Sequence, residues 1–197
     1  GVVLMCAVLL LMAGAQAQNQ NQNQNQSQTV APLSLSTQQL DSGFALDGRW
    51  DFQGPQGLQT QIEVPSAWER LYRKRLPVFG TATYRRTVIV PQHMLGKNLQ
   101  FYMDMFAGST LRIYANGVLV GYNGTYVGSP SRVPHFVPFE VQQREIEIRV
   151  VLSNFQLQWS GLVRPLWLGR SAAINQLAYR RSINFNVIFG IFVFLCF

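Results

Sequence analysis

The sequence has few of the residues that most often carry catalysis or bind metals. Among its 197 residues are two Cys, two His and nine Asp or Glu, against 16 Lys or Arg, so the net charge is +7. His93 and His135 lie far apart, and neither has Cys or acidic neighbours at the spacing of a metal site. Glu63 and Glu69 could in principle form a pair of catalytic carboxylates, but they fit solvated loop charges better. We therefore expect no enzyme activity, no metal and no cofactor in this chain.

Cysteine is also absent from the middle of the chain. Cys6 lies in an apolar run over residues 2–12, and Cys196 lies in a second apolar run over residues 183–197. The region between them is long enough to bury a core without disulfides.

The first apolar run has the features of a signal peptide. It is shorter than the roughly 20 residues that span a bilayer, and Ala15-Gln16-Ala17 fits a small-x-small cleavage site. We expect a cleaved signal peptide over residues 1–17, with an uncleaved anchor as the alternative. An Asn/Gln tract opens residues 18–40, and because such a tract has no apolar face to bury, we expect a disordered leader there.

The second apolar run favours the start of a transmembrane helix over residues 179–197. Its Phe, Ile and Val residues would overfill a core that is already complete, although a buried strand or helix is the alternative. Arg180 and Arg181 would then lie on the outer side, against the positive-inside tendency. Because the chain starts at Gly1 and stops inside this run, we expect a fragment of a membrane protein, with residues 18–180 in the periplasm or extracellular space.

The middle of the chain alternates between apolar and polar residues, as half-buried β-strands do. The Asn116-Gly117 dipeptide favours a type I′ turn, which predicts a hairpin over residues 111–122. Further strands are expected at residues 49–53, 58–64, 84–90, 99–105, 133–139, 145–152, 162–168 and 173–178, with one helical turn within residues 67–76. About nine short strands without a convincing amphipathic helix predict an all-β sandwich over residues 41–178.

Several short strings in this region resemble one known domain. They are Val64-Pro65 with Trp68, Tyr84-Arg85-Arg86, Asn116-Gly117 with Val120-Gly121, Ser153-Asn154, and Gly161 through Leu168. In this order and spacing they resemble the galactose-binding-like jelly roll of the sugar-binding domain in family 2 glycoside hydrolases. The resemblance covers about residues 46–170 and implies a jelly-roll fold, although such domains often have purely structural roles.

The segment after the jelly roll carries a second resemblance. No catalytic barrel begins after Gly169, and a hydrophobic segment begins instead. This order is similar to bacterial seven-transmembrane receptors with diverse intracellular signalling modules, whose extracellular domain is thought to recognise a carbohydrate. The resemblance implies a ligand-sensing domain whose intracellular module, a diguanylate cyclase, adenylate cyclase or histidine kinase in that family, is missing here. The alternatives are a non-catalytic sugar-binding domain of a secreted family 2-like hydrolase, and a structural domain that forms a homodimer.

A carbohydrate site needs an aromatic platform and fixed polar groups around it. Candidate ligand-binding residues in expected loops are Trp68, Arg70, Tyr122, Asn123, Tyr126, Asn154, Trp159 and Arg164. Trp159 is the best of them, because it follows a polar stretch and packing does not obviously require it, whereas Trp68 fits the core equally well. The basic residues from Arg70 to Arg75 could attract an anionic glycan or lipid headgroups, or could be a solvated loop. Nucleic acid is not expected as a partner of a secreted domain.

Overall fold

The computed structural model describes residues 29–70, 76–123 and 135–195, with side chains described from Phe136 to Ile183 in the last range. The predicted signal peptide, residues 18–28 of the predicted leader, and Tyr126 lie outside the described residues.

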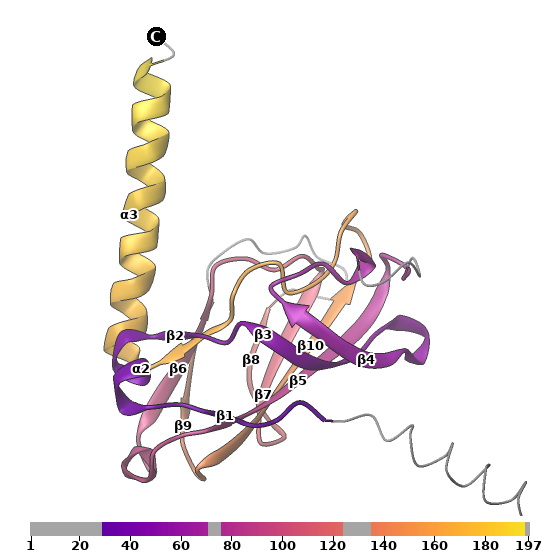
Figure 1. The fold of residues 1–197 in the computed structure, drawn as a ribbon. Helices are drawn as coiled ribbons and strands as arrows, with labels where there is room; N and C mark the ends of the chain where they lie inside the picture. Colours follow the sequence, from indigo (N-terminus) through magenta and orange to yellow (C-terminus); the bar gives the residue numbers. More distant parts are fainter. Residues whose placement is uncertain (1–28, 71–75, 124–134, 196–197) are drawn as a thin grey trace, which may run out of the picture.

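Strands dominate the described chain, and helices are few (Figure 1). The strands are β1 (Leu33–Ser34), β2 (Phe44–Ala45), β3 (Gly48–Gln53), β4 (Gln59–Val64), β5 (Gly80–Ile89), β6 (Asn98–Met103), β7 (Thr110–Ala115), β8 (Val118–Asn123), β9 (His135–Glu140), β10 (Glu145–Asn154) and β11 (Trp167–Gly169). The helices are α2 (Thr37–Ser42) and α3 (Ser171–Leu195), and short 3₁₀ turns are η1 (Pro55–Gly57), η2 (Trp68–Arg70) and η3 (Gln92–Met94).

Two sheets pack face to face. The larger sheet has the order β4-β3-β5-β10-β7-β8, with β1 pairing in parallel beside β5, and the smaller sheet has the order β2-β11-β6-β9. The other strand pairs are antiparallel. This architecture confirms the predicted all-β sandwich.

The core lies between the sheets because every second residue of each strand points inward. In β10, the alternate residues Ile146, Ile148, Val150 and Leu152 are all buried, as the sequence pattern predicts. Trp50, Trp68, Tyr84 and Phe101 are the largest aromatic side chains that are fully buried. The predicted hairpin is also confirmed, since Asn116 and Gly117 both have positive φ, 49° and 80°, between β7 and β8.

The N-terminal boundary of the sandwich lies earlier than predicted. Residues 33–42, most of them assigned to the disordered leader, form β1 and α2, and Leu35 and Leu40 are buried in the core. The reason is that apolar residues reappear after the Asn/Gln tract and supply a face to bury. Ser36 caps α2 through its hydroxyl, which accepts from the Gln39 N–H at 3.2 Å, and the Gln39 side chain accepts from the Ser36 N–H at 2.7 Å.

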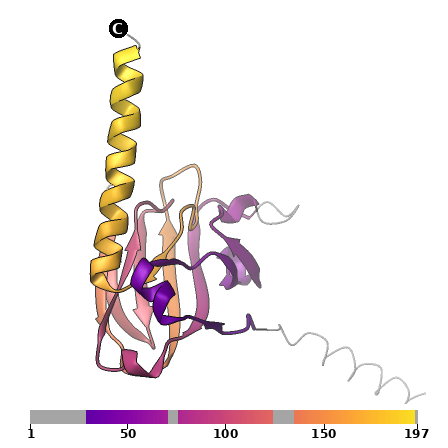
Figure 2. The same ribbon diagram turned by 60° about the vertical axis from the view of Figure 1, so that its left-hand side comes forward.

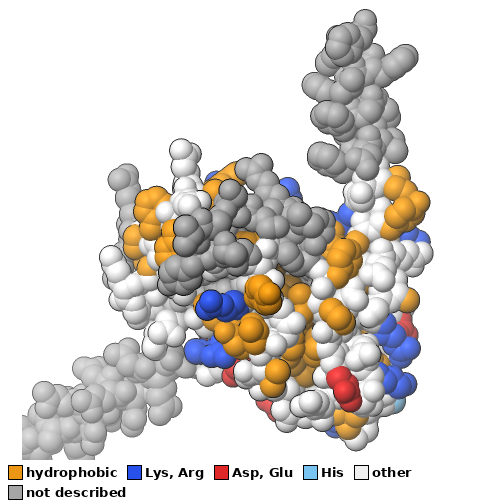
Figure 3. Space-filling view, turned by 180° about the vertical axis from the view of Figure 1, so that it is seen from behind, with side chains coloured by type: hydrophobic (Ala, Val, Ile, Leu, Met, Phe, Trp, Pro, Cys, Tyr) orange, Lys and Arg blue, Asp and Glu red, His pale blue; other side chains and the backbone are white. Residues whose placement is uncertain are grey.

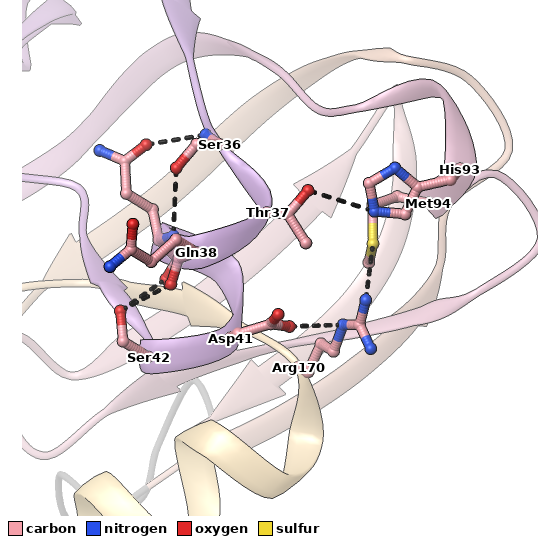
Figure 4. A network of polar contacts seen from close by, with 9 residues as sticks. Ser36, Thr37, Gln38, Asp41, Ser42, His93, Met94 and Arg170 are labelled. Carbon is pink, nitrogen blue, oxygen red and sulfur yellow. Dashed lines mark hydrogen bonds and ion pairs between the residues drawn. The ribbon is translucent and has the colours of Figure 1, made fainter.

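A polar network ties α2 to the body of the sandwich (Figure 4). Arg170 forms an ion pair with Asp41 at 2.8 Å, and its guanidinium also contacts the Met94 sulfur at 3.7 Å. Thr37 hydrogen-bonds His93 at 3.2 Å, so this histidine has a structural contact at the surface.

The predicted strand at residues 173–178 is wrong, because these residues form the first turns of α3. Ile174 and Leu177 lie one helical turn apart, and Ile174 is fully buried, which a period of 3.6 residues explains better than alternation. α3 begins beside α2 and runs past one side of the sandwich, which both ribbon views show (Figure 2).

Within the described residues, no helix combines the length and the apolarity needed to cross a membrane. The prediction that a transmembrane helix starts within residues 179–197 therefore finds no support in the structure.

The surface reflects the basic composition. Seen from behind, Lys and Arg side chains lie beside hydrophobic side chains near the middle of the sandwich, and few acidic side chains are visible (Figure 3).

Candidate functional site

Two residues that the sequence predicts as ligand contacts, Arg70 and Trp159, lie in one open depression of about 550 Å³. The depression lies between η2 and the loop 155–160 that follows β10. The loop lies at one end of the sandwich (Figure 1). Its lining residues are Glu69, Arg70, Gln156, Leu157, Gln158 and Trp159. An aromatic ring, an arginine, a carboxylate and two amides therefore converge on one solvent-filled space.

Trp159 is the aromatic component of this site. Its side chain is 55% exposed, which is unusual for a large aromatic residue that has a core nearby. The indole can therefore contact a ligand without a rearrangement of the core.

Asn154 holds the loop in place from below. It is fully buried, and its amide nitrogen lies 2.9 Å from the Leu157 carbonyl oxygen and 3.1 Å from that of Val78. Its side-chain oxygen accepts from the backbone N–H groups of Gln156 at 3.3 Å and Leu157 at 2.9 Å. The Asn154 side chain thus bonds backbone groups of the loop that would pair with a neighbouring strand if the loop were part of a sheet. These bonds fix the loop that carries Trp159.

Ser160 joins the two halves of the depression. Its N–H donates to Glu69 Oε2 at 3.1 Å, and its carbonyl accepts from the Trp68 N–H at 2.8 Å. Its hydroxyl donates to the Val78 carbonyl and lies 2.9 Å from the Asn154 amide nitrogen. The Glu69 carboxylate is therefore oriented by the same loop that presents Trp159.

Gly161 is required for the close approach of this loop to η2. Its φ is +141°, and a Cβ atom there would lie 2.5 Å from the Ser66 carbonyl oxygen and 3.0 Å from the Ala67 Cα. The Ser66 N–H donates to the Leu162 carbonyl at 2.8 Å, so the two segments run side by side here.

Acid–base catalysis of glycoside cleavage uses two carboxylates across the scissile bond. Among the described residues, Glu69 is the acidic residue that lines the depression. Glu63 forms an ion pair with Arg49 at 3.2 Å instead of facing Glu69. Nearby Tyr84 is fully buried, and burial, with a smaller contribution from the Glu69 charge, raises its pKa well above the ordinary 10.0. Tyr84 therefore keeps its proton at neutral pH.

The other predicted contacts that the structure describes do not line this depression. Trp68, the first residue of η2, is fully buried as part of the core, and its indole N–H donates to the Pro77 carbonyl at 3.0 Å. Tyr122 is 74% exposed on β8, and the adjacent Asn123 is buried. Arg164 is exposed elsewhere on the surface. Among the described residues no group of three or more His, Cys, Asp and Glu side chains could hold a metal ion.

Of the other lining residues, Gln158 is one of the polar groups that the sequence places near the candidate contacts, whereas Glu69, Gln156 and Leu157 were not predicted. Each of them lies within three positions of Trp159 or Arg70 in the sequence. Closeness to those two predicted contacts was therefore the feature of the sequence that could have identified them.

Comparisons with known proteins bear on the fold. Neither a scan against protein-family models nor a search of curated proteins gives a match for this sequence. Among solved structures, a GH2 β-galacturonidase from Eisenbergiella tayi bound to galacturonate matches with a TM-score of 0.51 and 19% identity, over 65% of this chain and 24% of that one. A β-D-glucuronidase from Dictyoglomus thermophilum matches with a TM-score of 0.52 and 15% identity, over 64% of this chain and 27% of that one.

A third similar structure is a β-glucuronidase from Ruminococcus gnavus in complex with uronic isofagomine, with a TM-score of 0.50, 15% identity, and coverage of 64% of this chain and 28% of that one. This chain thus spans about a quarter of the length of these enzymes. At such low identity the similarity shows the fold alone: the chain has a β-sandwich of the kind found within glycoside hydrolases.

Proposed function

We propose that the sandwich is a non-catalytic carbohydrate-binding domain whose ligand lies on Trp159, between Glu69 and Arg70. The observation that carries the proposal is the exposed indole, 55% accessible, in a polar depression whose loop is held by a buried asparagine. A sugar ring presents an apolar face to such an indole and hydroxyl groups to the surrounding amides and charges.

The residues around Trp159 suit an acidic sugar as well as a neutral one. Arg70 offers a planar fork of N–H donors, which pairs with carboxylates more strongly than with hydroxyls. One structural neighbour is described as bound to galacturonate, and two others are glucuronidases. Galacturonate, glucuronate and their oligomers are therefore the first ligands to test, with galactose as the neutral comparison.

A Trp159→Ala variant tests the site directly. Truncation of an aromatic anchor costs about 2 kcal/mol, so we expect affinity for the saccharide that binds best to fall about 30-fold. Titration calorimetry on the full chain would measure it. Tyr179→Ala is the matched control, since Tyr179 is 67% exposed on α3, away from the depression. If no saccharide binds in a broad glycan panel, or if both variants bind equally, the proposed site is wrong.

In its more specific form, the proposal is that the domain senses its ligand outside the cell for a membrane-bound bacterial signalling receptor. Support comes from the segment 104–109, which contacts the site at one end and α3 at the other. Ala107 and Gly161 exchange backbone hydrogen bonds of 3.0 and 2.8 Å. Ser109 accepts from the Phe155 N–H at 2.9 Å through its hydroxyl.

The other end of segment 104–109 is bound to α3 by an ion pair. Arg181 donates to Asp104 Oδ2 at 2.9 Å, and its guanidinium lies 5.5 Å from the Trp167 ring centre. Gln100 donates to Asn175 of α3 at 3.0 Å. A ligand that favours one arrangement of the loop 155–160 over another would therefore bias the position of α3 by population shift.

The alternative is a non-catalytic domain of a secreted glycoside hydrolase. It is favoured by the structural neighbours, in which a sandwich of this kind makes up about a quarter of each enzyme. The coding sequence beyond Phe197 separates the two forms. Membrane-spanning apolar segments and a cytoplasmic signalling module there would support the receptor, and a catalytic barrel would support the hydrolase. Analytical ultracentrifugation with and without the saccharide tests the remaining possibility, a structural domain that dimerises.

A further inference from the structure

Three arginines from three neighbouring strands lie together on the outer face of the larger sheet. Arg85 of β5 is paired directly with Arg149 of β10, and Arg149 is paired with Tyr114 of β7. Arg112 lies two residues before Tyr114, on the same face, and its cross-strand partner on β8 is Tyr122.

This face is open to solvent. Arg85 and Arg112 are exposed, Arg149 and Tyr114 are half-buried, and Tyr122 is 74% exposed. Ile113, between Arg112 and Tyr114, points the other way into the core, as do Ile148 and Val150 on either side of Arg149. The five side chains therefore form a connected basic and aromatic surface, which we call the arginine face.

The charges on the arginine face are poorly compensated within the described residues. The three ion pairs among those residues all involve other arginines, namely Arg49, Arg170 and Arg181. Like charges placed directly opposite each other on a sheet are destabilising, which applies to the Arg85–Arg149 pair.

Two acidic side chains border the arginine face without pairing with it. Asp51 is the cross-strand neighbour of Arg85, but both of its carboxylate oxygens accept from the Val30 N–H, at 3.0 and 3.2 Å. Glu147 lies two residues before Arg149 on β10, on the side away from Arg112 and Tyr122. Neither of these carboxylates therefore offsets the positive charge in the half of the face that includes Arg112 and Tyr122.

Arg149 is already oriented for a ligand. Its guanidinium carbon lies 4.2 Å from the centre of the Tyr114 ring, so the ring restricts the guanidinium. The Nε of Arg149 is buried and has no hydrogen-bond partner among the described residues. Because the Nε is buried, a ligand would meet the terminal N–H groups, and a guanidinium restrained in this way loses little entropy when those groups bind a carboxylate or a sulfate.

We propose that the arginine face binds an acidic polysaccharide, one that carries repeated carboxylate or sulfate groups. Neighbouring strands lie about 4.8 Å apart, so the guanidinium groups follow one another across the sheet and suit a row of anions better than one small anion. Tyr122 adds an exposed ring beside this row for the apolar face of a sugar. The proposal does not depend on the Trp159 site, because the two surfaces have no residue in common.

The test uses the full chain with dextran sulfate and carboxymethyl dextran as probes, which carry the anionic groups without a uronic acid, and neutral dextran as the comparison. We expect both acidic polysaccharides to bind with an affinity that falls as salt rises, and dextran not to bind through this face. The double variant Arg112→Ala/Arg149→Ala should lose at least about tenfold in affinity, because it removes two guanidinium groups that donate charge-assisted hydrogen bonds to the anions. Arg180→Ala is the matched control, because Arg180 is exposed on α3.

Further variants and ligands separate binding at the arginine face from binding at the Trp159 site and from nonspecific charge effects. Trp159→Ala should not reduce the excess affinity for the charged dextrans over neutral dextran, so failure of the Trp159 site and failure of the arginine face give different results. Thermal unfolding of each variant shows whether the fold is retained. The proposal is overturned if the double variant binds the polysaccharides as tightly as the parent. It is also overturned if duplex DNA or phosphatidylserine vesicles bind with the same arginine dependence while the polysaccharides do not.

Discussion

Replacement of Asn154 by Ala gives the sharpest test of how the candidate site is built. Asn154 is fully buried and lies under the loop that carries Trp159. Its amide group has two N–H donors directed toward the acceptors around it, and its oxygen accepts from two backbone N–H groups. The variant removes all of these bonds at once and leaves buried backbone groups of the loop without partners.

The expected loss is the sum of these bonds. A net contribution of about 1 kcal/mol for each of about four hydrogen bonds gives roughly 4 kcal/mol, and relaxation of the loop toward water reduces it to about 2–3 kcal/mol. A loss of this size is a large fraction of the stability of a typical domain.

Urea unfolding followed by circular dichroism would measure the change in the free energy of unfolding. The matched control is Asn98→Ala, because Asn98 is exposed at the start of β6 and should cost less than about 0.5 kcal/mol. We also expect saccharide binding to weaken in Asn154→Ala at temperatures where it is still folded. A loss below about 1 kcal/mol would refute the view that this residue supports the loop.

Three other substitutions test the physical arguments separately. Gly161→Ala should destabilise by about 2–4 kcal/mol, because its Cβ would meet the Ser66 carbonyl, whereas Gly57→Ala, with positive φ and open space, should cost about 1 kcal/mol in the same unfolding assay. Burial raises the pKa of Tyr84, so the folded state holds this proton more tightly; stability should be full below about pH 10 and fall as the pH rises above it. Tyr84→Phe should flatten that fall, which urea midpoints from about pH 9 to about pH 11 would show. Arg181→Gln should speed amide hydrogen exchange in the first turns of α3, because it removes the ion pair with Asp104. The global free energy of unfolding should change by less than about 1 kcal/mol, because this ion pair is partly exposed. Unchanged exchange would contradict the idea that the ion pair holds α3 against the sandwich.

Local patterns made much of the fold predictable. The alternation in residues 145–152 requires a strand with one buried face, and Asn116-Gly117 requires positive φ at two successive residues. Both features depend on neighbours in sequence, so they follow from the period of the side chains and from backbone sterics.

The first turns of α3 and the segment 33–42 were predicted wrongly for the same reason. A short segment with few apolar residues fits more than one period, and its state depends on the surface it packs against. Ile174 is buried near Gly43 of the segment that follows α2, and Leu40 of α2 is buried in the core, contacts that local sequence does not specify.

The sequence by itself therefore determined that this protein is an all-β sandwich, and that a polar loop carries an aromatic residue, Trp159, that the core does not need. Only the tertiary structure decided that Trp159 lies beside Arg70 and Glu69, because the Ser160–Glu69 hydrogen bond joins residues 91 positions apart. The arginine face likewise depends on the tertiary structure. Its residues come from strands that are adjacent in the sheet, although β10 is not adjacent in sequence to β5 or β7. Contacts of this kind depend on strand order and register, which the whole core fixes by burying one face of every strand.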